Sequence, residues 1–344
     1  MKNGEHYLAV FLFVGLPYLR LFIYLIRMRQ AALLALSLLF AAGAFGQAPQ
    51  RYVAITFDDL PVVSLENNLA VRQEVTSKLL KKFTDAKVPV IGFVNENKLY
   101  TDGTPNEAEV KLLRQWLDAG LDLGNHTFSH INLNENPLEK YEDEILRGEI
   151  ITKQLLQERN RQIRYFRHPY LMTGTTLEIK QKLGEFLTAH GYTIAPVTFD
   201  NADYMFARAY DIAKRKGDDK LRAQIGAAYV PYLESKVDYW ERQSVELLGR
   251  EIKQIFLMHA NSINADYFDK VAEMLKRRNY KFVTLAEALS DEAYKQPDLI
   301  TQKTWGISWL HRWALAKGKD YVLKGEPDVP EFITNLYNSP DPIK

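Results

Sequence analysis

The sequence predicts an α/β fold built around a parallel sheet. Seven short apolar runs alternate with longer segments of helical periodicity. The first six runs are wholly or mostly apolar, as strands covered on both faces are. Polar side chains cluster directly after five of the runs, where parallel α/β folds place their functional residues. Seven such units either close into a barrel or form an open doubly wound sheet.

The strands and helices follow one another in a regular order along the chain. The expected strands are 52–57, 89–94, 121–124, 163–166, 192–199, 254–258 and 281–284. The expected helical segments are 69–86, 106–119, 138–160, 175–190, 205–250, 264–278 and a last one near 285–295. The segment 205–250 is long for one connection, which predicts an insertion of two helices broken near Gly217.

A tail, 297–344, lies beyond the last strand–helix unit. It carries Trp305, Trp309 and Trp313 at intervals of four, so the three side chains share one helical face. We expect this face to pack on the barrel. The alternative is a lip near the site on which a sugar ring stacks.

The N-terminal region resembles an export signal. Arg27 and Arg29 precede an apolar run at 31–41, and the small residues Ala44 and Gly46 follow it. This order is typical of a secretory signal peptide. The segment 1–46 is therefore expected to be a signal peptide or a membrane anchor, with 1–27 an extension upstream of a start at Met28. We expect a protein that is exported to the periplasm or outside the cell, with anchoring to the inner membrane by the N-terminus as the alternative.

Composition excludes several function classes. The chain of 344 residues has 44 Lys and Arg against 43 Asp and Glu, a net charge of +1. This balance argues against a nucleic-acid binder and against a polybasic membrane-surface protein. No Gly-rich phosphate loop follows any expected strand, which argues against nucleotide binding. Cysteine is absent, so any metal must be held by His, Asp or Glu.

Carboxylates and imidazoles at two of the strand ends indicate a metal site. Asp58 and Asp59 end the first run, where burial makes two carboxylates costly unless their charge is used. Neighbouring side chains of an extended segment point to different sides, so one can bind a metal while the other faces a substrate. His126 and His130 follow the third run at a spacing that places both on one face of a helical turn. Two imidazoles and one carboxylate leave metal positions open for water and substrate.

Two further strand ends supply an arginine and a histidine. Arg167 follows the fourth run and can form a bidentate pair with a carboxylate. His259 follows the sixth run, where an aspartate from the neighbouring segment 200–204 can make it a general acid. A structural salt bridge and a structural histidine are the alternatives. Together, however, the five strand ends contain the parts of a metal-assisted hydrolase.

These residues resemble the motifs of the polysaccharide deacetylases with NodB homology, also called carbohydrate esterase family 4. The resemblance covers roughly residues 51–290, with the motifs in the family's order. They stand at 56–59 (T-F-D-D), 126–130 (H-[ST]-x-x-H), 167–170 (R-x-P-Y), 200–204 (D-x-x-D-[WY]) and up to His259.

The resemblance implies a distorted (β/α)7 barrel of the NodB type at 47–296, with a helical insertion at 205–250 and a C-terminal helical tail. It also implies a divalent metal, with zinc expected and Co²⁺ or another divalent ion as the alternative. By the resemblance, Asp58 is the catalytic base, supported by Arg167, and the metal ligands are Asp59, His126 and His130. His259 is the general acid, and Asp203 orients it. The backbone N–H of Tyr170 binds the oxyanion, and Tyr204 forms a wall of the acetyl pocket.

The implied activity is removal of acetyl groups from an N-acetylglucosamine-type polysaccharide or oligosaccharide. An O-acetyl carbohydrate esterase and a catalytically silent glycan-binding protein are alternatives. A non-haem iron oxygenase also uses two histidines and one carboxylate, but it leaves Asp58, Arg167 and His259 without a role. The chain departs from the family at Leu60-Pro61, where a glycine is usual, and at Tyr204, where tryptophan is common. These departures and the long segment 205–250 bear on the shape of the substrate groove.

Overall fold

The computed structural model describes residues 24, 28, 50–66, 68–297, 299–300 and 306–340. The chain divides into two compact units, Met1–Gln50 and Arg51–Lys344, and the second contains all the elements below. Apart from Tyr24 and Met28, the predicted signal peptide or anchor lies outside the described residues, as does Trp305. Within the described ranges, no helix combines the length and the hydropathy needed to cross a membrane.

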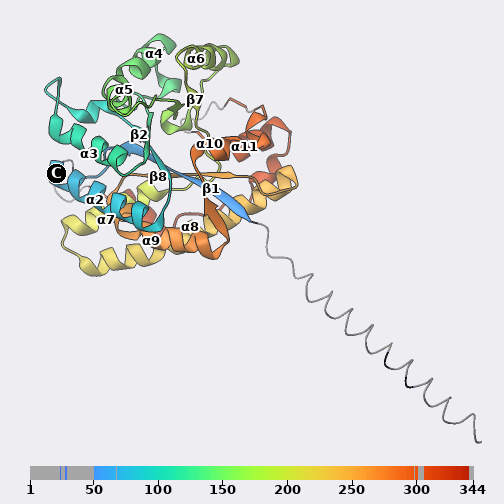
Figure 1. The fold of residues 1–344 in the computed structure, drawn as a ribbon. Helices are drawn as coiled ribbons and strands as arrows, with labels where there is room; N and C mark the ends of the chain where they lie inside the picture. Colours follow the sequence, from blue (N-terminus) through green and yellow to red (C-terminus); the bar gives the residue numbers. More distant parts are fainter. Residues whose placement is uncertain are drawn as a thin grey trace, which may run out of the picture. The chain divides into compact units, whose positions relative to one another are not determined.

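A parallel sheet of seven strands forms the centre of the unit and confirms the predicted fold class (Figure 1). Its order is β7 (Thr193–Ile194), β6 (Tyr165–Phe166), β5 (Asp122–Asn125), β2 (Val90–Val94), β1 (Arg51–Leu60) and β8 (Gln254–His259), with β9 (Tyr280–Phe282) paired to the start of β1. Each predicted strand is present, although the expected 192–199 shrinks to β7. A two-stranded hairpin of β3 (Tyr100–Thr101) and β4 (Thr104–Pro105) was not predicted.

The segment that begins with β7 closes the sheet into a distorted barrel. At its start it pairs with β6, and Ala195 donates its N–H to the carbonyl of Phe166 at 2.8 Å. At its end Phe199 bridges to Phe256 of β8. One run of chain therefore pairs with both edges of the sheet, which brings β8 round to β6. The carboxyl ends of the strands consequently form one ring.

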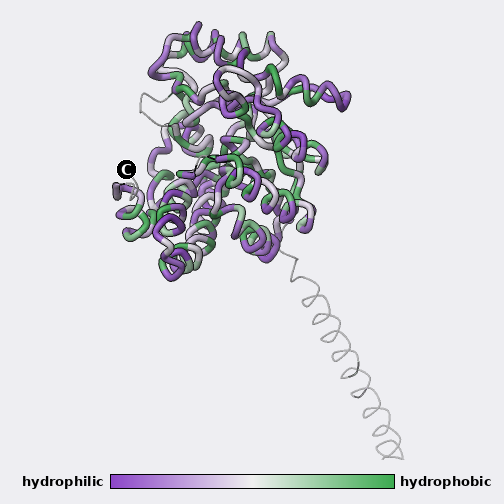
Figure 2. Tube along the Cα trace, turned by 90° about the vertical axis from the view of Figure 1, so that its left-hand side faces the viewer, coloured by the Kyte–Doolittle hydropathy of each residue, from purple (hydrophilic) through white to green (hydrophobic). Residues whose placement is uncertain are grey.

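Helices cover the outside of this barrel (Figure 1). They are α2 (Leu69–Ala86), α3 (Glu107–Asp118), α4 (Leu138–Arg147), α5 (Ile150–Gln157), α6 (Leu177–Ala189), α7 (Asp203–Arg215), α8 (Asp219–Leu248), α9 (Ser262–Arg277) and α10 (Leu285–Leu289). Short 3-10 turns lie at Glu96–Leu99, Leu133–Glu135, Pro169–Leu171, Glu292–Lys295 and Asp320–Leu323. Apolar and polar residues alternate along the helices (Figure 2), as expected for helices with one face on a sheet.

Local chemistry explains where the helices begin and end. Asn68, Thr176 and Asn261 cap α2, α6 and α9 by accepting a hydrogen bond from the first turn. The predicted insertion is confirmed as α7 and α8, separated by Gly217 at φ +64° and capped by Asp218.

The expected helical segment 138–160 is present, but it is divided at Gly148 into α4 and α5. A Cβ on Gly148 would lie only 2.6 Å from the carbonyl carbon of Thr127. The missing Cβ of Gly148 therefore lets the loop between His126 and His130 lie close against the end of α4.

The tail packs against the barrel unit through α11 (Trp309–Ala316) and α12 (Glu331–Tyr337). Trp309 donates its backbone N–H to the carbonyl of Val197 at 2.7 Å. The side chains of Trp309 and Trp313 are buried, and the ring of Trp313 lies 5.7 Å from that of Tyr294. These two tryptophans therefore belong to the interior and form no sugar-stacking lip.

Candidate active site

The parallel barrel places all five motifs at the carboxyl ends of neighbouring strands. Asp58 and Asp59 lie near the end of β1, and Asp58 is in register with His259 at the end of β8. The segment 126–130 follows β5 and Arg167 follows β6. Residues far apart in sequence are thereby brought to one edge of the barrel.

Asp59, His126 and His130 form a cluster whose ligand atoms all lie within 4.8 Å of one another. Oδ1 of Asp59 is 3.4 Å from Nε2 of His130 and 3.7 Å from Nε2 of His126. Nδ1 of His126 lies 2.8 Å from the carbonyl oxygen of Arg167, which can only accept, so Nδ1 carries the proton and Nε2 keeps its lone pair. Oδ1 of Asp59 is buried without a hydrogen-bond partner. The cluster thus fits a divalent metal.

The charge states of the three residues suit metal binding. Burial lowers the pKa of His126 well below its usual value and also lowers that of His130, so both imidazoles are neutral at physiological pH. Burial alone would raise the pKa of Asp59, but the positive charges of Lys98 and His259 hold it well below its usual range. Lys98 also donates from Nζ to the Asp59 carbonyl at 2.8 Å. No sequence pattern had pointed to this lysine.

The histidine segment is not the helical turn that its spacing predicts. Residues 126–130 form a loop in which Thr127 and His130 adopt φ of 64° and 57°. Left-handed backbone at non-glycine residues costs of order 1–3 kcal/mol each, so the surroundings must impose it. Asn125 Oδ1 accepts the Thr127 N–H at 2.7 Å, and Thr127 Oγ1 accepts the His130 N–H at 3.0 Å. The loop brings the two imidazoles together by these bonds.

Asp58 lies beside the cluster and is 2% exposed. Nη1 of Arg167 approaches Oδ2 of Asp58 at 3.4 Å, while Nη2 donates to Oγ1 of Thr56 at 3.0 Å. The predicted bidentate pair is therefore wrong, because the guanidinium divides its donors between Asp58 and Thr56. Burial raises the pKa of Asp58 to about 6 against the opposing charge of Arg167. Asp58 can therefore accept a proton near neutral pH.

His259 and Asp203 form a charged pair opposite Asp58. His259 Nδ1 lies 2.6 Å from Oδ1 of Asp203, and the His259 backbone N–H donates to Oδ2 at 2.9 Å. Asn264, which the motifs do not include, donates to Oδ2 at 2.7 Å. Burial disfavours the imidazolium, but the Asp203 carboxylate outweighs burial and raises the pKa of His259 to about 10. His259 is therefore a cation at neutral pH.

Two tyrosines lie at the rim. The ring of Tyr170 is 4.5 Å from that of His130, and the ring of Tyr204 is 6.4 Å from that of His259. Tyr170 adopts φ 55° and ψ 14°. Its carbonyl accepts the backbone N–H of Gly306 at 2.8 Å, so the tail contacts the loop that carries Tyr170.

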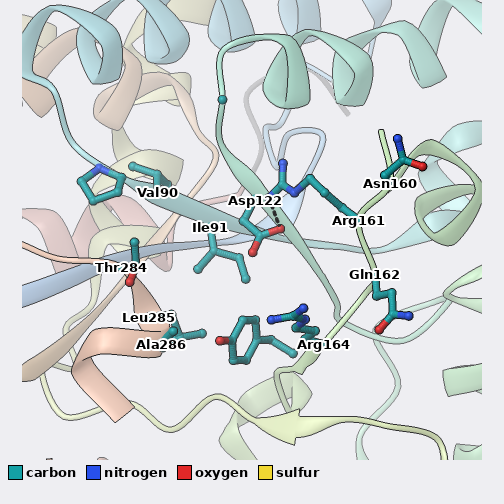
Figure 3. A pocket seen from close by; sticks show the side chains of 13 residues that line it. Val90, Ile91, Asp122, Asn160, Arg161, Gln162, Arg164, Thr284, Leu285 and Ala286 are labelled. Atoms are coloured by element: carbon teal, nitrogen blue, oxygen red, sulfur yellow. Dashed lines mark hydrogen bonds and ion pairs between the residues drawn. The ribbon is translucent and has the colours of Figure 1, made fainter. Parts of the chain in front are cut away.

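A cavity of about 360 Å³ lies at the opposite end of the strands (Figure 3). It is lined by the starts of β2 and β5, including Ile91 and Asp122, and by Arg161 and Arg164. Nη2 of Arg161 donates to Oδ1 of Asp122 at 2.6 Å. No motif residue lines this cavity, so the chemistry belongs to the other end of the barrel.

Residues 45–188 match the family model described as polysaccharide deacetylase. The matched region contains Asp58, Asp59, His126, His130 and the Arg167–Tyr170 segment. The resemblance inferred from the motifs is thus confirmed for this part of the chain. Asp203 and His259 lie beyond the matched region, and no curated protein matches the chain.

Solved structures of carbohydrate esterase family 4 are also similar to the chain. Peptidoglycan deacetylase PdaC from Bacillus subtilis is 18% identical, with 70% of this chain and 90% of that chain covered and a TM-score of 0.44. A family 4 carbohydrate esterase from Streptomyces lividans is 18% identical, covering 70% and 97%, with a TM-score of 0.44. BA3943 from Bacillus anthracis, a family pseudoenzyme, is 15% identical, covering 71% and 67%, with a TM-score of 0.45. The fold itself follows from the strand order and parallel register above.

Proposed function

Given the match of residues 45–188 to polysaccharide deacetylases, we propose that the chain hydrolyses acetyl groups from an N-acetylglucosamine-type glycan. One observation carries this proposal. Asp58 and His259 lie in register on neighbouring strands, beside the cluster of Asp59, His126 and His130. Near neutral pH Asp58 can accept a proton, whereas His259 carries one that it can donate. A base and an acid beside a metal-ligand set are what amide hydrolysis needs.

The proposed metal ligands are Asp59, His126 and His130. A bound divalent cation, for which we propose zinc, would supply Lewis acidity at the acetyl carbonyl and the attacking water. The donor set of one carboxylate and two neutral imidazoles suits that ion. Asp59 and the two histidines are therefore assigned to metal binding and Asp58 to proton transfer.

In the proposed reaction, Asp58 accepts a proton as water attacks the acetyl carbonyl carbon. Arg167 fixes the orientation of Asp58 through its contact with Oδ2. The backbone N–H of Tyr170 donates to the developing oxyanion, a kind of contact worth about 2.7–4 kcal/mol. The His259 imidazolium gives its proton to the leaving nitrogen as the C–N bond breaks, and the products are acetate and a free amine. Asp203 keeps His259 charged, and Tyr204 walls the acetyl pocket.

The charge of His259 favours an amide over an ester substrate. An amine must be protonated as it leaves, whereas an alcohol leaves more readily without an acid. A side chain held as a cation with a pKa of about 10 therefore suits amide cleavage. His259→Gln should reduce acetate release from an amide far more than from an O-acetyl sugar.

Acetate release tests the proposal. Zinc-loaded protein is given N-acetylglucosamine oligomers, peptidoglycan and acetylated xylan, and Asp58→Asn is the control. Acetate from an amino-sugar substrate, absent with the variant, supports the proposal. Glycan binding without acetate release from any substrate, in protein with bound zinc, would contradict it. We further propose that 47–296 forms the catalytic barrel and that 1–46 directs the protein out of the cytoplasm.

A further inference from the structure

The C-terminal helix brings an aromatic side chain to the rim of the candidate active site. Tyr337, the last residue of α12, has its ring centroid 5.7 Å from that of Tyr204, with the planes at 77°. The Tyr204 ring in turn lies 6.4 Å from that of His259. Tyr204 is 46% exposed and Tyr337 is half-buried. A line of rings therefore runs from the proposed acid through the exposed Tyr204 to Tyr337 of the tail.

This ring pair is held in place by the helices that carry it. Helix α12 packs on α7, and Ile333 of α12 is fully buried. Arg208 of α7 donates from Nε to the carbonyl of Tyr337 at 2.9 Å and from Nη2 to that of Ser339 at 3.2 Å. Helix α7 begins at Asp203 and Tyr204. Helix α7 thus positions both Asp203, the partner of His259, and the ring of Tyr204. It also anchors the segment that carries Tyr337.

The shape and chemistry of this corner suit a sugar. A pyranose ring presents one apolar face of C–H groups and a rim of hydroxyl groups. Two rings at nearly a right angle offer an apolar face, while their phenol groups can hydrogen-bond to hydroxyls. Because both rings are already fixed, binding costs little side-chain entropy.

We propose that Tyr337 and Tyr204 form a stacking platform for the sugar unit next to the one that is deacetylated. The platform rests on the proposed function for the identity of its ligand. The platform gives the tail a role in recognising a polymer, because a single acetylated sugar bound at the acetyl pocket would leave the Tyr337 ring without a contact to the ligand. Tyr337 is therefore a specificity-determining residue outside the five motifs.

Binding to a protein that cannot turn over tests the platform. Calorimetry measures the affinity of zinc-loaded Asp58→Asn full-length protein for N-acetylglucosamine oligomers of one to five units. Adding Tyr337→Ala should weaken binding of the longer oligomers about tenfold, an effect of the size expected for a lost aromatic contact, and leave the single sugar unchanged. Tyr337→Phe keeps the ring and should bind within about twofold of the parent.

A control variant and a measurement of acetate release distinguish failure of the platform from failure of the proposed function. Tyr321→Ala removes another exposed tyrosine of the tail and should leave affinity unchanged. Thermal melting shows whether each variant is folded. Equal affinity of folded Tyr337→Ala for every oligomer, or no oligomer binding by the parent, would overturn the platform. Tyr337-dependent binding in a protein that releases no acetate with Asp58 intact would support the platform while contradicting the proposed function.

Discussion

Asp58 and Asp59 are neighbours in sequence, yet their surroundings separate their chemistry. Asp58 is buried with one long contact to Arg167, so burial dominates and its pKa rises to about 6. Asp59 lies near the positive charges of Lys98 and His259, which outweigh burial, so its pKa falls well below the usual range. One carboxylate is therefore suited to exchange a proton and the other to stay charged.

Asp58→Asn is expected to bind zinc normally and to lose acetate release. The amide keeps the shape of the side chain but cannot accept a proton, and general bases contribute typically about 10²–10⁴-fold to rates. Zinc content by atomic absorption and initial rates of acetate formation measure the two properties. Turnover within a few-fold of the parent at full zinc occupancy would show that another group is the base.

Asp203→Asn is expected to move the alkaline limb of the pH–rate profile to lower pH. Asp203 raises the pKa of His259 to about 10, so removing its charge lets His259 lose its proton earlier. The raised pKa also means that stability from this pair is fully present below the unfolded value of about 6.5 and is lost as pH rises through about 10. Urea unfolding at pH 6 and pH 10 should show that loss in the parent and less of it in the variant.

Asp200→Asn is the control for this shift. It removes the other carboxylate of the same segment, which forms its hydrogen bond with Asn201. We expect it to move the alkaline limb less than Asp203→Asn does. An equal movement would mean that overall charge at this edge, and not the Asp203 contact, sets the proton affinity of His259.

The loop at Pro169–Leu171 depends on an element far away in sequence. Tyr170 and Leu171 both adopt φ of 55°, a conformation that must be imposed on non-glycine residues. Arg312 of α11, fully buried, donates to the carbonyl of Leu171 at 2.5 Å and to Oγ1 of Thr173 at 2.9 Å. The tail therefore supports the backbone of the loop that carries Tyr170.

Arg312→Lys should lower kcat more than it changes KM, because it loses the planar fork that holds the loop while keeping the charge. Leaving a buried carbonyl unpaired costs about 1–3 kcal/mol, so Arg312→Ala should also lower the urea midpoint. Steady-state kinetics and urea unfolding follow both variants. A lower midpoint with unchanged kcat in both would reduce Arg312 to a purely structural role.

Strands and most helices could be predicted because their signals are local. The apolar runs and the caps at Asn68 and Thr176 lie within the elements that they define. The close contact between Gly148 and Thr127 could not be predicted, since the two residues belong to different segments. The hairpin of β3 and β4 carries no strong alternation in its two-residue strands.

The sequence predicted which residue types form the candidate site and that they lie at the ends of strands. Asp58, Asp59, His126, His130, Arg167, Asp203 and His259 all lie at one edge of the barrel. The contacts that Lys98, Thr56 and Asn264 make with site residues were not predicted, because they arise from tertiary structure. The position of Tyr337 beside Tyr204 was missed for the same reason. Trp309 and Trp313, which the regular spacing in the tail singled out, are buried packing residues.

The barrel as a whole holds its ligand cluster ready before a metal binds. Asp59 Oδ1 is buried without a hydrogen-bond partner, and two neutral imidazoles lie within 3.7 Å of it. A buried charge lacking a full set of partners destabilises the folded state, and a cation relieves that cost. Metal binding should therefore stabilise the folded chain.

Zinc at one hundred times its dissociation constant is expected to add about 2.7 kcal/mol to the free energy of unfolding. Thermal melts of metal-free protein with increasing zinc measure the gain, and excess chelator should reverse it. Asp59→Asn is the matched variant, because asparagine tolerates the φ of 68° at this position but brings no charge to the cluster. Its melting temperature should respond little to zinc. A zinc response as large as that of the parent would mean that the ion binds elsewhere and that the barrel edge is not the metal site.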